Sequence, residues 1–218
     1  MRLALLLLIA LAAVRIQAEE LDHELFPPAE EVALFDGETL TGWSIPEKAF
    51  FRDHGKVTVQ EGCIVLEAGN AGTGIASSQP VPRLNYELRL EAKRIKGTDF
   101  FCGLTFPYAE SYVSLIVGGW GGGATGLSNV DGSSAVENET STFREYRQDQ
   151  WYAIRLRVTE QKIEAWIDED QAIDLETKDH RFSIWWEQEP LRPLGISTWY
   201  TKSALRNIRL TRLVKPSD

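Results

Sequence analysis

Cysteine is scarce in this chain, since only Cys63 and Cys102 occur among its 218 residues. Two cysteines form at most one disulfide, which excludes the disulfide-rich scaffolds of small secreted proteins. Both cysteines lie within apolar, strand-like runs. Either they pair across neighbouring strands, or they are two buried free thiols that pack as small hydrophobic side chains.

Histidine is also rare, and the three residues His23, His54 and His180 are far apart in the sequence. Zinc sites are recognised by histidine and cysteine ligands at short, regular spacings. The sequence therefore gives no indication of a zinc site.

Basic residues are outnumbered, because 23 Lys and Arg face 32 Asp and Glu, a formal net charge of −9. Removal of residues 1–18 would take away Arg2 and Arg15 and no acidic residue, which changes this charge to −11. Such a surface repels a polyanion, and no block rich in Lys or Arg overrides the net charge. We therefore expect no nucleic acid partner, whereas neutral sugars remain compatible.

Long apolar runs are lacking except at residues 3–14, which follow Arg2 and end before Arg15. A membrane-spanning helix needs about 20 apolar residues, whereas the apolar region of a secretory signal peptide needs roughly 7–15. The run therefore predicts a signal peptide over residues 1–18, cleaved after Ala18, with an uncleaved anchor as the alternative. We expect an exported protein, periplasmic or extracellular, with no stable membrane span after cleavage.

Helical periodicity is also absent, and alternation of apolar and polar residues takes its place. It covers residues 84–90, 154–158 and 163–167, which predicts half-buried strands. A short turn separates the last two, which predicts an antiparallel hairpin. Further β-rich runs lie at residues 57–59, 63–66, 100–106, 112–117 and 194–199.

Many short strands with turn residues between them predict an all-β fold, a two-sheet antiparallel jelly-roll sandwich. Roughly 200 residues suit a single domain of this kind. We expect it to span residues 32–213, after a lead-in at 19–31 and before a tail at 214–218. A glycine-rich stretch at residues 118–123 and a polar one at 129–147 interrupt the strands and are candidate positions for a site.

Specific motifs stand at both ends of the expected domain. It opens with Leu34-Phe35-Asp36-Gly37 and Leu40-Thr41-Gly42-Trp43, and it closes with Leu205-Arg206-Asn207-Ile208-Arg209-Leu210. Between them lie Asn85-Tyr86-Glu87-Leu88 and the strand at Trp151. In these motifs and their order the chain resembles the 3-keto-disaccharide hydrolase domain.

The resemblance covers residues 32–213. It implies a concanavalin A-like sandwich, export from bacterial cells and hydrolysis of glycosides whose sugar has been oxidised to a 3-ketone. Residues 99–104, Asp-Phe-Phe-Cys-Gly-Leu, depart from the Asn-Ser-Gly-type segment that we expect of the family at this place.

Aromatic rings are the first requirement of a carbohydrate site, because they cover the C–H faces of a sugar. Trp120 lies among glycines, which let the backbone approach a ligand closely. Trp186 and Trp199 are further candidates, beside Trp185 and Tyr200. Because side chains alternate along a strand, we expect one residue of each adjacent pair to lie in the core. The remaining tryptophans are assigned to the scaffold: Trp43, Trp151 and Trp166.

Acidic residues follow the glycine-rich stretch, at Asp131, Glu137 and Glu139. Cleavage of a glycosidic bond usually employs two carboxyl groups, and Glu137 and Glu139 would share one side of an extended segment. Asn129 and Asn138 are candidate partners for sugar hydroxyls. The Glu-x-Asp-x-x-Glu string of laminarinase-type enzymes does not occur, which disfavours an ordinary retaining glucanase.

A 3-keto sugar permits a different route, because its ketone acidifies the neighbouring C2 hydrogen. A base can then eliminate the aglycone, provided that a donor or a metal stabilises the enolate, before water adds back. On this hypothesis Asp131 or Glu137 is the base, and Arg144 or a bound cation such as calcium stabilises the enolate. A solvated acidic loop with no catalytic role is the alternative.

Three functions are compatible with these features. They are a hydrolase or lyase acting on 3-keto glycosides, a non-catalytic lectin-like module, and a structural domain of an exported assembly. The family resemblance favours the first, and the aromatic and polar loops suffice for the second, since one fold can host both. Carbohydrate is the expected partner.

Overall fold

The computed structural model of the chain describes residues 28–214. The predicted signal peptide, residues 1–18, lies outside the described residues, as do residues 19–27 of the expected lead-in and 215–218 of the expected tail. Within the described part, no helix has the length and apolar character needed to cross a membrane.

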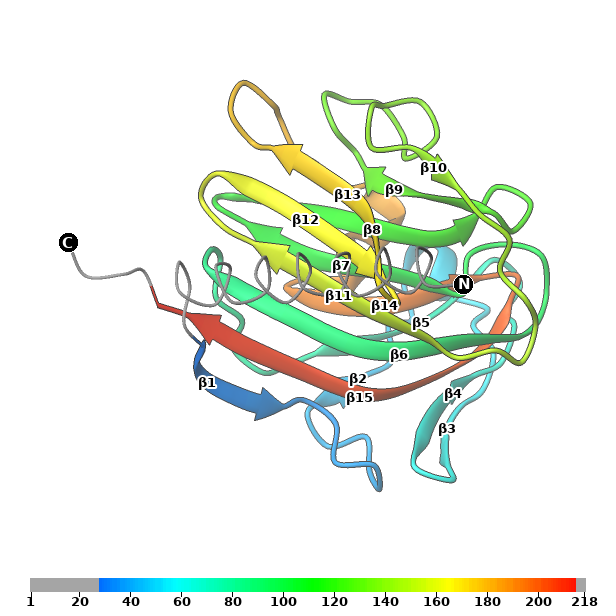
Figure 1. Ribbon diagram of the computed structural model, residues 1–218. Coiled ribbons are helices and arrows are strands. Elements are labelled where there is room, and N and C mark those ends of the chain that lie inside the picture. Colours follow the sequence, from blue (N-terminus) through cyan, green and yellow to red (C-terminus); the bar gives the residue numbers. More distant parts are fainter. Residues whose placement is uncertain (1–27, 215–218) are drawn as a thin grey trace, which may run out of the picture.

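Two antiparallel β-sheets make up most of the described chain (Figure 1). Sheet A has eight strands: β13 (Asp170–Glu176), β12 (Lys162–Ile167), β11 (Tyr152–Val158), β6 (Tyr86–Lys96), β15 (Lys202–Leu213), β4 (Cys63–Leu66) and β3 (Val57–Gln60), with β1 (Pro28–Ala33) also paired to β15. Sheet B has seven: β10 (Thr142–Phe143), β9 (Ala124–Ser128), β8 (Ser111–Gly119), β7 (Cys102–Tyr108), β14 (Leu194–Trp199), β5 (Gly72–Ser77) and β2 (Trp43–Ser44). This arrangement confirms the predicted two-sheet antiparallel jelly-roll sandwich.

Alternating side chains give the long strand β6 its core face. Leu88 and Leu90 are buried, because every second side chain of a strand points to the same face of its sheet. The neighbouring strand β11 places Leu156 opposite Leu88 and Ile154 opposite Leu90. β11 pairs in turn with β12, which confirms the hairpin predicted between residues 154 and 167.

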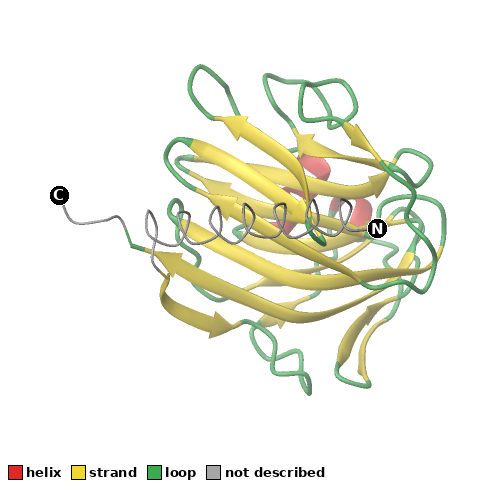
Figure 2. Cartoon of the chain, in the orientation of Figure 1, coloured by secondary structure: helices red, strands yellow, loops and turns green. Residues whose placement is uncertain are grey.

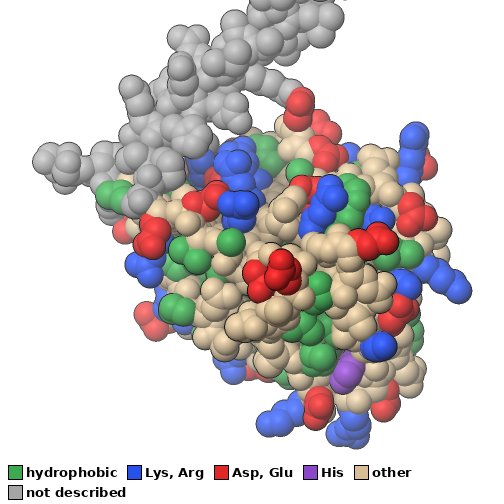
Figure 3. Space-filling model, turned by 90° about the horizontal axis from the view of Figure 1, so that it is seen from below, with side chains coloured by type: hydrophobic (Ala, Val, Ile, Leu, Met, Phe, Trp, Pro, Cys, Tyr) green, Lys and Arg blue, Asp and Glu red, His purple; other side chains and the backbone are tan. Residues whose placement is uncertain are grey.

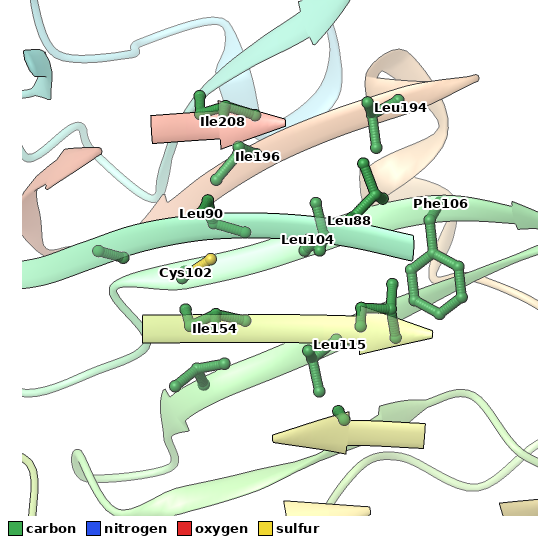
Figure 4. Close-up of a cluster of buried hydrophobic side chains, with 14 of the residues drawn as sticks. Leu88, Leu90, Cys102, Leu104, Phe106, Leu115, Ile154, Leu194, Ile196 and Ile208 are labelled. Atoms are coloured by element: carbon green, nitrogen blue, oxygen red, sulfur yellow. The ribbon is translucent and has the colours of Figure 1, made fainter. Parts of the chain in front are cut away.

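The core lies between the two sheets, where apolar side chains from both meet (Figure 4). Cys102 of β7 is one of them, and burial raises the pKa of its thiol to about 12 because the thiolate would lose its hydration. Cys63 of β4 packs in a separate small cluster with Val65 and Ala204. Both cysteines are free, so the alternative of two buried thiols is the one found.

The outward face of β6 is less solvated than its alternation predicts. Glu87 is only 4% exposed because arginine side chains close over it. Nη2 of Arg157 lies 3.1 Å from Oε2 of Glu87, and Nε of Arg89 lies 2.5 Å from Oε1. The carboxylate is thus paired with positive charge, the condition under which a buried charge is tolerated.

The closing motif of the domain ties β15 to β6 through Glu91. Nη2 of Arg206 and Nδ2 of Asn207 each lie 2.6 Å from one of the two carboxylate oxygens of Glu91. The guanidinium of Arg206 also covers the Trp151 ring, 4.1 Å from its centroid. The motif therefore stabilises the pairing of two strands at the centre of sheet A.

Charges of both signs are distributed over the surface. Lys and Arg side chains are interspersed with Asp and Glu on the face that Figure 3 shows. This intermixing leaves that face without a continuous basic patch.

Small and polar side chains cover part of the outward face of sheet B. In β8, Leu115 belongs to the core, whereas Ser114 and Ile116 on either side of it face outward. The short 3-10 helices η1 (Ala49–Phe51) and η2 (Trp186–Leu191) contact each other and β5 beside this face (Figure 2). The face is therefore flanked by helices and loops rather than fully covered, which leaves room for a cleft.

Candidate functional site

A cleft of about 300 Å³ opens on this outward face of sheet B, and we call it the aromatic cleft. Ser114 and Ile116 of β8 and Ser128 of β9 contribute to its floor. Four aromatic rings and two carboxyl groups also line it: Phe100, Trp120, Trp185, Trp199, Asp99 and Glu187. A sugar-sized hollow with these side chains has the composition of a carbohydrate site.

The aromatic rings of the cleft come from four different segments. Trp199 ends β14, and its ring stacks on that of Phe100 with centroids 6.2 Å apart. Trp185, which precedes η2, donates a hydrogen bond from Nε1 to Oγ of Ser128 over 3.1 Å. Trp120 lies in the glycine-rich loop after β8 and is 47% exposed. The sheet and the short helix thus bring together rings that are far apart in the sequence.

Arg94 of β6 holds the loop that carries Trp120. Its buried Nη2 donates to the carbonyl oxygens of Gly118, over 2.9 Å, and Gly122, over 2.8 Å. Gly118 has a φ of +75°, and a Cβ at this position would lie 2.5 Å from Nη2 of Arg94. The backbone conformation and the close approach of the guanidinium therefore both require glycine at residue 118.

Asp99 is one of the two carboxyl groups in the cleft. Its Oδ1 accepts a hydrogen bond from the backbone N–H of Phe100 over 2.7 Å. Burial raises the pKa of Asp99, although the backbone N–H groups of Phe100 and Trp120 and the charge of Arg94 act in the opposite direction. A carboxyl group that keeps its proton to higher pH in a ligand cleft is suited to donate that proton.

Glu187 of η2 is the other carboxyl group. Its Oε2 is buried and has no hydrogen-bond partner among the described residues. The next residue, Gln188, is held by Ser197, whose Oγ donates to Gln188 Oε1 over 3.2 Å and so fixes η2 on the sheet. Because a buried acceptor without a donor is costly, Oε2 of Glu187 would be stabilised by a hydrogen bond donated from a ligand hydroxyl.

The structure brings the candidates Trp120 and Trp199 together in the aromatic cleft, whereas Trp186 lies outside its lining. The expectation that one residue of each adjacent pair lies in the core is wrong, because Trp185, Trp186 and Tyr200 are all exposed. Trp185 and Trp186 lie at the start of a 3-10 helix, and Tyr200 follows the end of β14. The alternation of a strand therefore does not apply to them.

The acidic loop, residues 129–141, lies around His180 and contributes no residue to the lining of the cleft. Oδ2 of Asp131 is 2.7 Å from Nδ1 of His180, and Oε1 of Glu139 is 3.4 Å from its Nε2. The hydrogen bond from His180 and that from the backbone of Arg181 lower the pKa of Asp131. Across residues 28–214, no group of three or more His, Cys, Asp or Glu side chains is placed to hold a metal ion.

Glu137 lies in a turn, not in an extended segment. Its backbone N–H donates to the carbonyl oxygen of Ser134, and its Oε2 accepts from Oγ of Ser134 over 2.6 Å. Nδ2 of Asn138 donates to the carbonyl oxygens of Leu127 and Ser134, each over 2.8 Å. The idea that Glu137 and Glu139 share one side of a strand is therefore wrong, and the amide of Asn138 is used within the loop.

Asn129 and Arg144 also lie outside the lining of the cleft. Asn129 is buried, and its Oδ1 accepts from Oγ of Ser128 over 2.9 Å. Arg144 binds near the end of β12, with Nη2 3.5 Å from Asp168 and Nη1 3.6 Å from Asp170. The structure thus does not bring the predicted catalytic residues and the aromatic rings together.

Asp99, Glu187 and Phe100 line the cleft but were not predicted from the sequence as residues of the site. Asp99 and Phe100 begin the segment that departs from the expected family pattern, and this departure was the available signal. Glu187 directly follows Trp185 and Trp186, yet only the folding of η2 onto sheet B encloses it. No short sequence pattern marks that long-range contact.

Solved structures share the fold at low sequence identity. A Bacillus subtilis protein of unknown function with a galectin-like fold gives a TM-score of 0.60 at 8% identity, covering 88% of this chain and 100% of that one. The Crh5 transglycosylase in complex with NAG gives 0.56 at 13% identity, covering 87% and 86%. A candidate glycosyl hydrolase from Parabacteroides distasonis gives 0.53 at 14% identity, covering 84% and 94%.

Comparison at the level of sequence families gives a match over nearly the whole described chain. No curated protein matches the sequence. The family model of the 3-keto-alpha-glucoside-1,2-lyase-like domain matches residues 30–211, which confirms the resemblance seen in the end motifs. The chain therefore belongs to the 3-keto-alpha-glucoside-1,2-lyase-like domain family, a family of carbohydrate-active domains.

Proposed function

We propose that this protein cleaves glycosides of 3-keto sugars and that the sugar ring binds in the aromatic cleft. One observation carries the proposal beyond family membership. The cleft joins four aromatic rings to two carboxyl groups, Asp99 with a raised pKa and Glu187 with an unpartnered oxygen. Rings for binding and two carboxyl groups for proton transfer are what such a reaction requires.

The first step is removal of the proton at C2 of the sugar. The C3 ketone acidifies this hydrogen, and Oε2 of Glu187 is the base that takes it. The electron pair of the C2–H bond forms a C2=C3 double bond, and the carbonyl oxygen becomes an enolate oxygen. Glu187 suits this role because its Oε2 has no hydrogen bond to protein among the described residues.

The second step expels the aglycone from C1. The enolate reforms the C3 carbonyl, a C1=C2 double bond forms and the bond from C1 to the leaving oxygen breaks. Asp99 donates its proton to that oxygen, and the raised pKa keeps this proton in place up to a higher pH than in an ordinary aspartate. Water then adds its oxygen to C1 and gives a proton to Asp99, and Glu187 returns its proton to C2. This gives the free 3-keto sugar and restores both carboxyl groups, so that the net reaction is hydrolysis.

Export is part of the proposal. The apolar run at residues 3–14 and the small residue Ala18 support removal of residues 1–18 and release of the protein to the periplasm or the extracellular space. N-terminal sequencing of the protein from the periplasmic fraction and the medium tests this. A first residue of Glu19 supports it, and recovery of the intact chain from the cytoplasm contradicts it.

A non-catalytic carbohydrate-binding module is the second candidate. The exposed rings of Trp120 and Trp185 in the cleft favour it, because stacking on a sugar needs no carboxyl group. On this alternative the cleft retains glycosides without cleaving them.

Product release separates the two candidates. Purified protein is incubated with a panel of glucosides and their 3-keto derivatives, and the released aglycone is measured. Release from the keto derivatives alone supports the proposed reaction. Binding without release supports the second candidate.

A further inference from the structure

A second group of aromatic side chains adjoins the aromatic cleft, and we call it the aromatic platform (Phe50, Trp186, Trp199 and Tyr200). The ring centroid of Phe50 lies 5.4 Å from that of Trp186 and 5.0 Å from that of Trp199. Tyr200 meets Trp199 edge to face at 5.6 Å. The four rings therefore form one continuous contact group.

Much of the platform is open to solvent. Trp186 is 62% exposed and Tyr200 is 55% exposed. Solvent exposure of adjoining large aromatic rings on a folded domain is typical of a binding surface. The cleft already described does not account for these two residues, because neither of them lines it.

Buried side chains hold the two short helices that carry Phe50 and Trp186 of the platform. Phe51 anchors η1 and is 1% exposed, and Leu191 anchors η2 and is fully buried. The two short helices also contact each other. The exposed rings are thus presented by buried neighbours, so that little side-chain entropy is lost when a ligand binds.

Trp199 connects the platform to the cleft. It lines the cleft and stacks on Phe100 there, and it also contacts Phe50 of the platform. A ligand with one ring in the cleft therefore has its next ring beside the platform. For a glycoside whose sugar lies in the cleft, that next ring belongs to the leaving group.

We propose that the aromatic platform is a binding site for the leaving group of the substrate, and that this leaving group is an aromatic ring. The inference rests on the proposed function. A second sugar would need several donors and acceptors for its hydroxyls. The platform consists mainly of the faces and edges of four rings, with only the indole N–H groups of Trp186 and Trp199 and the hydroxyl of Tyr200 as polar groups. Aromatic rings pack on such surfaces in tilted or stacked geometries, like those the four rings adopt with one another.

Steady-state kinetics of Trp186→Ala test the proposal with three substrates: phenyl 3-keto-glucoside, methyl 3-keto-glucoside and a 3-keto disaccharide of glucose. We expect KM for the phenyl substrate to rise about fivefold or more, while its kcat stays nearly unchanged. For the methyl glucoside and the disaccharide, both KM and kcat should stay nearly unchanged. Trp186→Phe retains a ring and is expected to recover most of the affinity. Phe143→Ala removes an exposed aromatic side chain outside the cleft and platform and is the matched control.

Two results would overturn the inference. One is an equal effect of Trp186→Ala on all three substrates, or no effect on any. The other is an effect confined to the disaccharide, which would assign the platform to a sugar leaving group. Binding of unoxidised phenyl glucoside, followed by tryptophan fluorescence, tests the platform even if wild-type protein releases no aglycone. If the wild-type protein releases no aglycone, the proposed reaction is refuted. Weaker binding of phenyl glucoside by Trp186→Ala would then still support the platform as a binding site.

Discussion

Nη2 of Arg94 lies 2.9 Å from the carbonyl oxygen of Gly118, so a side chain of sheet A fixes a loop at the edge of sheet B. The same nitrogen binds the carbonyl oxygen of Gly122, and Trp120 lies between the two glycines. The position of an exposed aromatic ring in the cleft thus depends on a buried cation of the opposite sheet.

Replacement of Arg94 by methionine is therefore expected to affect both stability and the site. The change removes the hydrogen bonds to buried carbonyl oxygens and leaves these unsatisfied, which we expect to cost about 3 kcal/mol in the free energy of unfolding. Urea denaturation measures this loss. Arg209→Met is the control, because Arg209 is half exposed and pairs with Glu31 at the surface, where an ion pair contributes at most about 1 kcal/mol. Equal losses for the two variants would contradict the role of Arg94.

Trp120→Ala is expected to weaken binding of a glycoside at least about fivefold, because the variant loses one stacking surface of the cleft. The residue is half exposed, so its removal should leave the urea midpoint close to that of the wild type. Isothermal titration with an unreactive glycoside measures the affinity. Unchanged affinity would remove Trp120 from the site.

The two thiols give a direct test of the core. Protein unfolded without reductant should react with two equivalents of a thiol reagent, because Cys63 and Cys102 are free. In the folded protein Cys102 should not react, since it is fully buried and its thiol pKa is raised to about 12. A total of zero equivalents after unfolding would indicate a disulfide.

Asp99 should make stability depend on pH. Its pKa in the folded protein is raised, so the folded state holds this proton more tightly than the unfolded state does. The stability that the proton contributes is complete below the ordinary aspartate value of about 4 and is lost as pH rises through the raised pKa. Asp99→Asn cannot ionise and should therefore lose less stability than the wild type over this range. If the urea midpoints of the wild type and of Asp99→Asn change by the same amount as pH rises, the raised pKa of Asp99 is contradicted.

Sequence patterns predicted the fold well because the forces that form it are local and repetitive. Leu88 and Leu90 alternate with charged residues, and this period predicted a strand over residues 84–90, which overlaps the first part of β6, together with its core face. The 154–167 hairpin follows from two such runs and the short turn between them. Burial of Glu87 was not predictable in this way, because it depends on Arg157 from another strand.

The candidate site was harder to predict because it assembles through contacts that are distant in the sequence. Asp131 was a catalytic candidate, yet its carboxylate is hydrogen-bonded to His180, 49 residues later. Glu187 was not singled out, because only the packing of η2 against β5 and β14 brings it to the cleft. Trp120 and Trp199 were named as candidates because they are large aromatic rings, and Trp120 also lies among glycines; both line the aromatic cleft.

Aglycone release by four variants tests the central claim most directly. Asp99→Asn and Glu187→Gln remove the proposed acid and base in the cleft, whereas Asp131→Asn and Glu137→Gln remove carboxyl groups outside its lining. We expect the first two to lower kcat on a 3-keto glucoside at least about 100-fold with little change in glycoside binding, and the last two to stay within about threefold of the wild type. Loss of activity in Asp131→Asn or Glu137→Gln, with Asp99→Asn and Glu187→Gln active, would place the chemistry in the acidic loop and contradict the account.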